Sequence, residues 1–194
     1  MNDHALFLGK FFTQLTRGNT IASIAPSSRW LARTTVRNIE WDRARTLIEL
    51  GAGTGPITRV IAERSRPECR VIVVERDPDF AGLLRQRFGA LPNFDIVEGD
   101  VRDLAPLLAD SGITQADHII SGLPVPSFPR DLQHALIRTV RTILRPEGTF
   151  NQITEIPWVF WPFYRKYFEQ VEFAFEPRNL PPSGAYYCRG PKDV

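Results

Sequence analysis

Three glycines within five positions, in the segment ELGAGTGPITRVIAERS (49–65), constrain the fold of this chain more than any other feature. They follow a short apolar run, TLIEL (46–50), and precede a segment whose apolar residues recur at helical spacing. A glycine-rich turn between a buried strand and a helix lets a ligand approach the backbone closely, because no side chain stands in the way. The spacing differs from G-x-G-x-x-G and from the phosphate loop G-x-x-x-x-G-K-[ST]. Neither a pyrophosphate nor a triphosphate is therefore indicated.

Apolar runs recur along the rest of the chain and predict the sheet. Those at 70–75, 94–97, 117–121 and 149–154 are typical of buried parallel strands, and helical patterns separate them. Two later runs, VEFAFE and AYYCR, are joined by PRNLPPSG, which is too short for a crossover helix, so this pair is expected to be antiparallel. We predict an α/β domain with a Rossmann-like seven-stranded sheet, five strands parallel and the C-terminal pair antiparallel.

The first forty residues form a basic segment on a chain whose net charge is only +2. No acidic residue occurs between Asp3 and Glu40, an interval that holds five lysines and arginines. In ALFLGKFFTQL, Phe7, Phe11 and Leu15 are spaced at i, i+4 and i+8, which predicts a basic amphipathic helix suited to an anionic membrane surface. A helix packed on its own domain, or an arm that contacts nucleic acid, would have the same pattern. We therefore divide the chain into an N-terminal helical segment, 1–40, and a main domain, 41–194.

Several classes of protein are disfavoured by composition. The two cysteines, Cys69 and Cys188, provide neither a disulfide framework nor metal-ligand spacing, so no metal is expected. The first residues lack the apolar core and cleavage site of a secretory signal, and no stretch reaches eighteen apolar residues. We expect a cytoplasmic protein that can still contact a membrane surface; the sequence does not indicate an oligomeric state.

The residues around the glycine loop predict the chemistry of the ligand. Glu49 before the loop would repel a phosphate and suits a ligand with an ammonium group, such as S-adenosylmethionine. Glu75 ends the second predicted strand and is placed to bind ribose hydroxyls, a role for which Asp77 competes. Gly99 and Asp100 end the third strand, where a carboxylate and a backbone N–H could contact the edge of adenine. The alternative is a glycine turn that serves only to pack the strand against the helix.

These segments resemble a known family. LIELGAGTGPIT, VVERDPDF and EGDVRDL are similar to the first three motifs of class I S-adenosylmethionine-dependent methyltransferases. More narrowly, IASIAPSSRWLAR, IISGLPVPSFP and EPRNLPPSGAYYCR resemble bacterial phosphatidylethanolamine N-methyltransferases, whereas 155–175 carries no recognisable motif. The resemblance implies a peripheral enzyme at the inner membrane face that methylates a phospholipid toward phosphatidylcholine. The cofactor-binding residues that motifs and resemblance together predict are Ser27, Ser28, Glu49, Gly51, Gly53, Gly55, Glu75, Arg76, Gly99, Asp100, Val101 and Ser121. Ser27 is also the expected N-cap of a helix.

The segment after the fourth predicted strand argues against a nucleic-acid acceptor. Adenine N6-methyltransferases of the ribosomal RNA dimethylase type place N-x-P-Y there, whose carbonyls bind the amine and whose ring stacks on the extruded base. This chain has Gly122, Leu123, Pro124 and Val125 instead, without the amide or the ring. The expected substrate-binding residues are Gly122, Leu123 and Pro124, with Arg178 and Asn179 from the C-terminal motif. The alternative acceptors are another amino lipid, such as an ornithine lipid, and a ribosomal RNA adenine. The alternatives to a methyltransferase are a nicotinamide dehydrogenase and a non-catalytic binding module.

Two further features concern the acceptor. An aliphatic ammonium has a pKa of roughly 10 and must lose a proton before it attacks the methyl donor, which requires a proton acceptor. The candidates are Tyr186, Tyr187 and Glu155; His118 and His134 are less well placed. Seven of the eleven residues in WVFWPFYRKYF (158–168) are aromatic, which is typical of a membrane interface or of a helix that covers the sheet. Pro162 predicts that this segment begins as a loop or lid.

Overall fold

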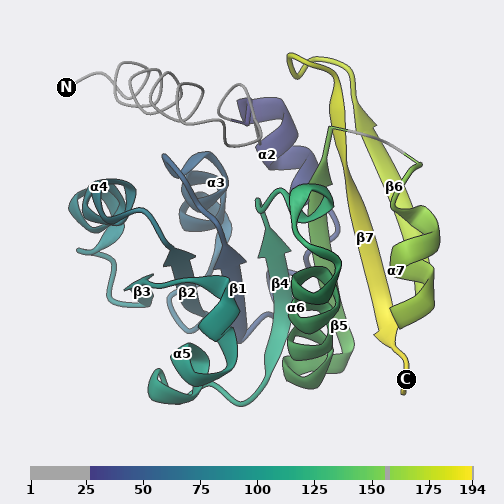
Figure 1. Cartoon of the computed structure of the whole chain (residues 1–194). Helices are drawn as coiled ribbons and strands as arrows, with labels where there is room; N and C mark the ends of the chain where they lie inside the picture. Colours follow the sequence, from purple (N-terminus) through teal and green to yellow (C-terminus); the bar gives the residue numbers. More distant parts are fainter. Residues whose placement is uncertain (1–26, 156–157, 194) are drawn as a thin grey trace.

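The computed structural model describes residues 27–155 and 158–193, which form a seven-stranded sheet covered by helices on both faces (Figure 1). The strand order is β3-β2-β1-β4-β5-β7-β6. Strands β1 to β5 pair in parallel, and β7 pairs antiparallel with both β5 and β6. The fold predicted from the sequence is confirmed. The elements are α2 (Arg29–Thr35), β1 (Thr46–Leu50), α3 (Pro56–Arg64), β2 (Arg70–Glu75), α4 (Pro78–Phe88), β3 (Phe94–Glu98), η1 (Val101–Asp103), α5 (Leu104–Asp110), β4 (Ala116–Ser121), η2 (Val125–Ser127), α6 (Arg130–Ile143), β5 (Leu144–Thr154), α7 (Trp161–Tyr167), β6 (Phe168–Glu176) and β7 (Ser183–Pro191).

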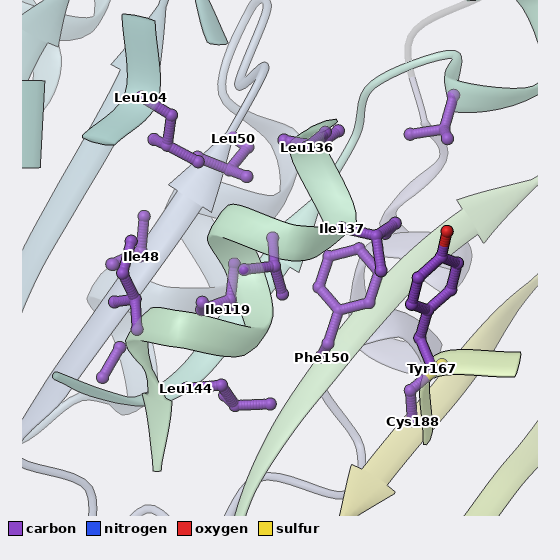
Figure 2. Packing of buried hydrophobic residues seen from close by; sticks show 14 of the residues in the cluster. Ile48, Leu50, Leu104, Ile119, Leu136, Ile137, Leu144, Phe150, Tyr167 and Cys188 are labelled. Carbon is purple, nitrogen blue, oxygen red and sulfur yellow. The ribbon is translucent and has the colours of Figure 1, made fainter. Parts of the chain in front are cut away.

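Alternation along the strands divides the apolar residues between two cores. Leu47 and Val71 face α2, α3 and α4, whereas Ile48 and Ile72 face α5, α6 and α7. Figure 2 shows the second core, in which Ile48 and other strand side chains pack against helix residues such as Leu136. Because both faces are covered, most of the buried side chains of β1, β2 and β4 are apolar, as their sequences predicted.

Local signals explain where several helices begin. Asp77 caps α4 by accepting hydrogen bonds from the N–H groups of Asp79 and Phe80, and Pro78 occupies the first turn. In α2 the cap is Ser28, whose hydroxyl accepts from the Leu31 N–H, so the expectation that Ser27 caps this helix is wrong. Helix α7 begins at Trp161 with Pro162 in its first turn, and the residues before it form a turn, as the proline predicted.

Helix α2 is fixed to the C-terminal strands by polar contacts. The Ser28 N–H donates to Asn179 Oδ1, and the Thr34 hydroxyl donates to Glu176 Oε2 over 2.9 Å. The Tyr187 hydroxyl donates to the Thr34 carbonyl. The described part of the predicted N-terminal segment, 27–40, thus packs on the sheet, while Phe7, Phe11 and the rest of the predicted amphipathic helix lie outside the described residues.

Within the described ranges, no helix is long and apolar enough to cross a membrane. The same residues contain no group of three or more His, Cys, Asp or Glu side chains that could hold a metal ion.

Candidate functional site

A cavity of about 950 Å³ lies at the edge of the sheet where the parallel strands end. Gly51, Glu75, Gly99 and Gly122, which follow or end β1, β2, β3 and β4, all line it. The chain runs outward from β1 in both directions, through β2 to β3 and through β4 to β5, so the strand order reverses between β1 and β4. Ligands of open α/β sheets bind in the crevice at such a reversal. Four elements distant in sequence therefore meet in one cleft.

The glycine loop forms the floor of this cleft. Gly51, Gly53 and Gly55 all have positive φ, at 71°, 56° and 84°, a conformation that other residues adopt only with strain. A Cβ on Gly53 would meet no atom within 4 Å, because this residue faces the open cleft. A Cβ on Gly51 would lie 2.6 Å from Leu123 Cδ2, so the loop packs tightly against the segment after β4.

Glu75 ties the end of β2 to the glycine loop. Its carboxylate accepts a 2.8 Å hydrogen bond from the Gly53 N–H and a 2.9 Å hydrogen bond from the Asp77 N–H. A carboxylate has about four lone-pair sites, so each oxygen can accept a further bond from a ligand hydroxyl. Asp77 also lines the cleft, but its carboxylate caps α4. The geometry favours Glu75 over Asp77 for the ribose role.

Asp100 lies beyond the end of β3 and remains ionised at neutral pH. It accepts hydrogen bonds from the backbone N–H of Arg102 and, over 2.7 Å, from its guanidinium. The hydrogen bond from the Arg102 side chain is the main reason that the pKa of Asp100 falls to about 2, and Arg76, 3.6 Å away, adds a smaller effect. The carboxylate is therefore available as an acceptor for an exocyclic amine.

The lining of the cleft fits a cation with a flat apolar ring better than it fits a phosphate. Among the described lining residues, Glu75, Asp77, Asp100 and Asp131 are acidic, and only Arg76 and Arg102 are basic. S-adenosylmethionine carries a sulfonium and an ammonium against one carboxylate, a net charge of +1 that this lining complements. The apolar lining residues would accommodate an adenine ring; they are Val74, Pro78, Phe80, Val101, Leu123, Pro124, Phe128, Pro129 and Leu132.

Glu49 lies behind the glycine loop and is fully buried. Among the described residues, neither of its carboxyl oxygens has a hydrogen-bond partner of good geometry, and the same holds for the nearby Thr58 hydroxyl. Burial raises the pKa of Glu49 to about 8; the proximity of Thr58 opposes this rise and the Glu75 carboxylate adds to it. Glu49 does not line the cleft, so the structure places it next to the loop but not in contact with the space for a ligand.

Seven of the twelve predicted cofactor residues line the cleft and five do not. Those that line it are Gly51, Gly53, Glu75, Arg76, Gly99, Asp100 and Val101. Three of the five exceptions have structural roles. Ser28 caps α2, Gly55 is the N-cap residue of α3, and the buried Ser121 hydroxyl accepts from the Leu123 N–H. Ser27 is half-buried just before α2.

The three predicted proton acceptors do not meet at the cleft. Tyr186 is fully buried between β7 and α7, where Trp161 packs edge-on against its ring. Tyr187 faces the opposite side of the sheet and binds α2 through its hydroxyl. Glu155 is exposed just after β5. Burial raises the pKa of both tyrosines, so at neutral pH they form the tyrosinate that could accept a proton less readily than an exposed tyrosine does.

The predicted substrate residues divide in the same way. Gly122, Leu123 and Pro124 line the cleft. Arg178 and Asn179 do not; they lie in the turn between β6 and β7. Arg178 makes a bidentate ion pair with Glu176, whose carboxyl pKa it lowers to about 2, and Asn179 fixes the turn and the start of α2.

Some lining residues were not among the predicted ones. Ser127, Phe128 and Asp131 lie on the wall formed by η2 and the start of α6. The sequence contained a signal for them, because IISGLPVPSFP extends to Pro129 and includes Ser127 and Phe128. Arg102 could have been found from its position two residues after Asp100, a spacing that allows an ion pair across a single turn.

Comparison with protein families and with known proteins agrees with this geometry. Residues 47–148 match a family model described as a methyltransferase domain. An ornithine lipid N-methyltransferase of Singulisphaera acidiphila is 65% identical over 193 residues, which cover 100% of this chain and 99% of that protein. A probable ribosomal RNA small subunit methyltransferase A of Methanosarcina mazei is 34% identical over 93 residues, 48% of this chain and 30% of that protein.

Solved structures show the same fold. A precorrin-6y C5,15-methyltransferase from Geobacter metallireducens superposes with a TM-score of 0.68 at 17% identity, over 90% of this chain and 95% of that one. Human methyltransferase-like protein 13, solved in complex with SAH, superposes with a TM-score of 0.60 at 19% identity, over 83% of this chain and 78% of that one. At these identities the likeness concerns the fold alone.

Proposed function

We propose that this chain, which belongs to the class I S-adenosylmethionine-dependent methyltransferases, methylates the amine of an ornithine lipid. The observation that carries the proposal is the 65% identity to an ornithine lipid N-methyltransferase over the whole chain. That match includes the segments outside 47–148, which form the start of the domain and its C-terminal strands. A match that extends over the donor-side and the acceptor-side segments alike supports a shared acceptor as well as a shared cofactor.

This proposal replaces phosphatidylethanolamine as the preferred acceptor. The sequence resemblance implied phosphatidylethanolamine, with ornithine lipid as the alternative, and the comparison favours the alternative. Both headgroups offer a primary aliphatic amine, so both agree with the segment after β4. They differ in their anion, because an ornithine acylated on its α-nitrogen carries a carboxylate, whereas phosphatidylethanolamine carries a phosphate.

The residues of the cleft would hold the adenosine half of the cofactor at two points. Glu75 presents carboxylate oxygens for ribose hydroxyls, and Asp100 presents an ionised carboxylate for the adenine amine. Gly51 and Gly53 leave the backbone accessible where side chains would fill the cleft. When bound, S-adenosylmethionine supplies an electrophilic methyl group on its sulfonium. The chain then has to orient the acceptor amine in line and exclude water, and Leu123 and Pro124 provide the apolar wall beside the loop.

The structure also bears on the adenine alternative. Val125 stands where an adenine methyltransferase has its stacking ring. This side chain is fully buried in the core that α5, α6 and α7 cover. The Leu123 carbonyl accepts a 2.8 Å hydrogen bond from Gln152 Nε2, which holds this segment against β5. An extruded base would therefore lack both the amide and the ring that the chemistry requires.

Action on a lipid would place the protein at a membrane surface. The N-terminal sequence, with Phe7, Phe11, Lys10 and Arg17, supports this part of the proposal by its composition. We propose peripheral association with the cytoplasmic face, in which the basic segment contributes attraction to anionic lipids.

The deciding experiment gives the purified full-length chain S-adenosylmethionine with a labelled methyl group and one acceptor at a time. The acceptors are ornithine lipid and phosphatidylethanolamine in matched detergent micelles, and an unmodified ribosomal RNA transcript. Mass spectrometry of the products identifies mono-, di- and trimethylated species, and a Glu75→Ala variant provides the inactive control. We expect ornithine lipid to be methylated at least about tenfold faster than phosphatidylethanolamine, a difference of roughly 1.4 kcal/mol in transition-state binding. Preferential methylation of phosphatidylethanolamine or of RNA would overturn the proposal.

A further inference from the structure

Four large apolar side chains are exposed in the described part of the chain, and they gather at one end of the molecule. They are Trp158, Val159, Phe175 and Leu180, with 68%, 62%, 52% and 83% of their surfaces accessible. Single exposed apolar residues are ordinary on a soluble protein, but a local group of them marks an interaction surface.

The pairing of the strands places these residues close together. Gly184 of β7 pairs with Thr154 at the end of β5 and with Phe175 near the end of β6, so these three positions lie at one level of the sheet. Trp158 follows a few residues after Thr154, and its ring centroid is 6.4 Å from that of Phe173, two residues before Phe175 on the same face. Leu180 belongs to the turn that joins β6 to β7, and this turn lies at the same end of the sheet (Figure 1).

Two arginines and a tryptophan border this group. The guanidinium groups of Arg29 and Arg178 both stack on the Trp30 ring, 4.6 Å and 4.1 Å from its centroid. Such stacks keep cations beside an amphipathic ring, an arrangement that suits the headgroup level of a bilayer. Arg178 belongs to the same turn as Leu180, so the basic residues on the α2 face of the sheet and the apolar residues on its α7 face meet at this turn.

This end of the molecule is also the end at which the cleft opens. The cleft lies beyond the carboxyl ends of β1 to β4, and β5 and β6 end at the same edge of the sheet (Figure 1). Apolar residues at this edge of the sheet would therefore face in the same direction as the opening of the cleft.

We propose that Trp158, Val159, Phe175 and Leu180 form a docking rim that inserts into the interfacial layer of a lipid bilayer, with Arg29 and Arg178 at the level of the phosphates. The inference rests on the proposed function, since the rim would bring the cleft to a lipid whose amine is methylated. It differs from the contact predicted for the N-terminal segment, because the rim is built on the folded sheet. It also differs from the predicted role of 158–168 as a whole, because Tyr164, Tyr167 and Phe168 are buried in the core.

The charges of the rim indicate that apolar insertion dominates its binding. Arg29 and Arg178 are opposed by Glu176, which pairs with Arg178, and by the exposed Glu155. Arg33, exposed one turn further along α2, adds one more positive charge, so the local excess is small. Binding through the rim should therefore depend weakly on salt, whereas binding through a basic segment should depend on it strongly.

The test compares full-length variants in sedimentation with vesicles of phosphatidylglycerol and phosphatidylcholine at low and high salt. Trp158→Ser with Leu180→Ser removes the two most exposed apolar side chains of the rim. Phe11→Ser with Phe12→Ser alters the basic segment, and Arg43→Ser with Glu147→Ser is the matched control at the opposite end of the sheet. We expect the rim variant to lose at least about tenfold in vesicle affinity at high salt, and the control variant to bind as the wild type does. Quenching of tryptophan fluorescence by brominated lipid should fall in Trp158→Ser.

The outcomes separate the rim from the proposed function. Calorimetric titration with S-adenosylmethionine and activity on micellar ornithine lipid should be unchanged in the rim variant, which shows that it is folded. If the wild type methylates no lipid but the rim variant still loses vesicle binding, the function fails and the rim stands. Vesicle binding equal to that of the wild type at high salt would overturn the rim. So would a wild-type dimer in analytical ultracentrifugation that the rim variant abolishes, because the surface would then be covered by a second copy.

Discussion

The backbone N–H of Gly53 donates a 2.8 Å hydrogen bond to the Glu75 carboxylate, joining the loop after β1 to the end of β2. A side chain expected to bind the cofactor thus also holds the loop that forms the cofactor's floor. Truncation of Glu75 to alanine removes both functions together, whereas the isosteric glutamine keeps one side-chain oxygen and so can separate them.

Glu75→Ala should weaken S-adenosylmethionine binding by more than about tenfold, because it removes the ribose acceptor and the carboxylate that accepts the hydrogen bond of the Gly53 N–H. Glu75→Gln retains one oxygen and should lose less. Isothermal titration calorimetry on both folded variants measures the difference. Unchanged affinity in Glu75→Ala would contradict the assignment of this residue.

Gly122→Ala should weaken cofactor binding, although it adds neither a charge nor a large side chain. A Cβ at this position would lie 2.7 Å from the Gly51 carbonyl oxygen, so the backbone of the glycine loop would have to move. Gly82→Ala is the matched control, because a Cβ there meets nothing within 4 Å and lies within α4. We expect the control to stabilise the protein by about 0.5–1 kcal/mol and to bind cofactor normally. Equal cofactor affinity in the two variants would contradict this prediction, because the glycine loop would then have accommodated the added Cβ.

Glu49 should make the stability of the free protein depend on pH. In the unfolded chain this carboxyl group loses its proton near its ordinary pKa of 4.5, whereas in the folded chain it keeps the proton up to about 8. The folded state therefore holds the extra proton, and the free energy of unfolding falls as pH rises through this window, by at most about 1.4 kcal/mol per pH unit. Glu49→Gln should flatten this decline in urea denaturation between roughly pH 6 and pH 8. Parallel curves for the two proteins would show that Glu49 is ionised throughout.

Tyr186→Phe should leave methyl transfer almost unchanged, within about twofold, because the hydroxyl is buried away from the cleft. Among the described residues this hydroxyl has no hydrogen-bond partner of good geometry, so its removal should not reduce stability. Tyr187→Phe should instead cost about 1 kcal/mol, since it removes the bond to the Thr34 carbonyl that fixes α2. Thermal denaturation and steady-state kinetics on the two variants separate these effects. A large fall in kcat for Tyr186→Phe at full stability would restore it as a proton acceptor.

The sequence predicted best those features that depend on a run of neighbouring residues. The strands followed from continuous apolar runs, and the cofactor end of the cleft followed because parallel strands that end in Gly51, Glu75 and Gly99 must meet at one edge. The cap of α2 was misplaced by one residue, since Ser27 and Ser28 have equal capping potential in sequence and only the backbone conformation distinguishes them. The fifth strand was expected at 149–154, but β5 begins earlier, at Leu144, directly after α6 ends at Ile143.

The acceptor side was harder to predict, because its residues are placed by contacts over long separations. Asn179 and Ser28 are 151 positions apart, and no periodicity relates them. Tyr186 and Tyr187 are adjacent in a motif, yet the alternation of β7 directs them to opposite faces of the sheet, into different cores. Whether such a residue reaches the cleft depends on strand register, which the sequence of one chain does not reveal.

The sheet order separates two tasks that this enzyme class must combine. The predicted cofactor residues that line the cleft all follow or end β1, β2 and β3, on one side of β4 in the sheet. Strands β5, β6 and β7, with α2 and the docking rim, lie on the other side of β4. A change of acceptor from a nucleobase to a lipid would therefore require changes in the segment after β4, 122–125, as well as in the β5–β7 half, whereas the cofactor residues after β1, β2 and β3 could be retained. This agrees with a family model that spans only 47–148 and with RNA-modifying relatives that match only about half of the chain.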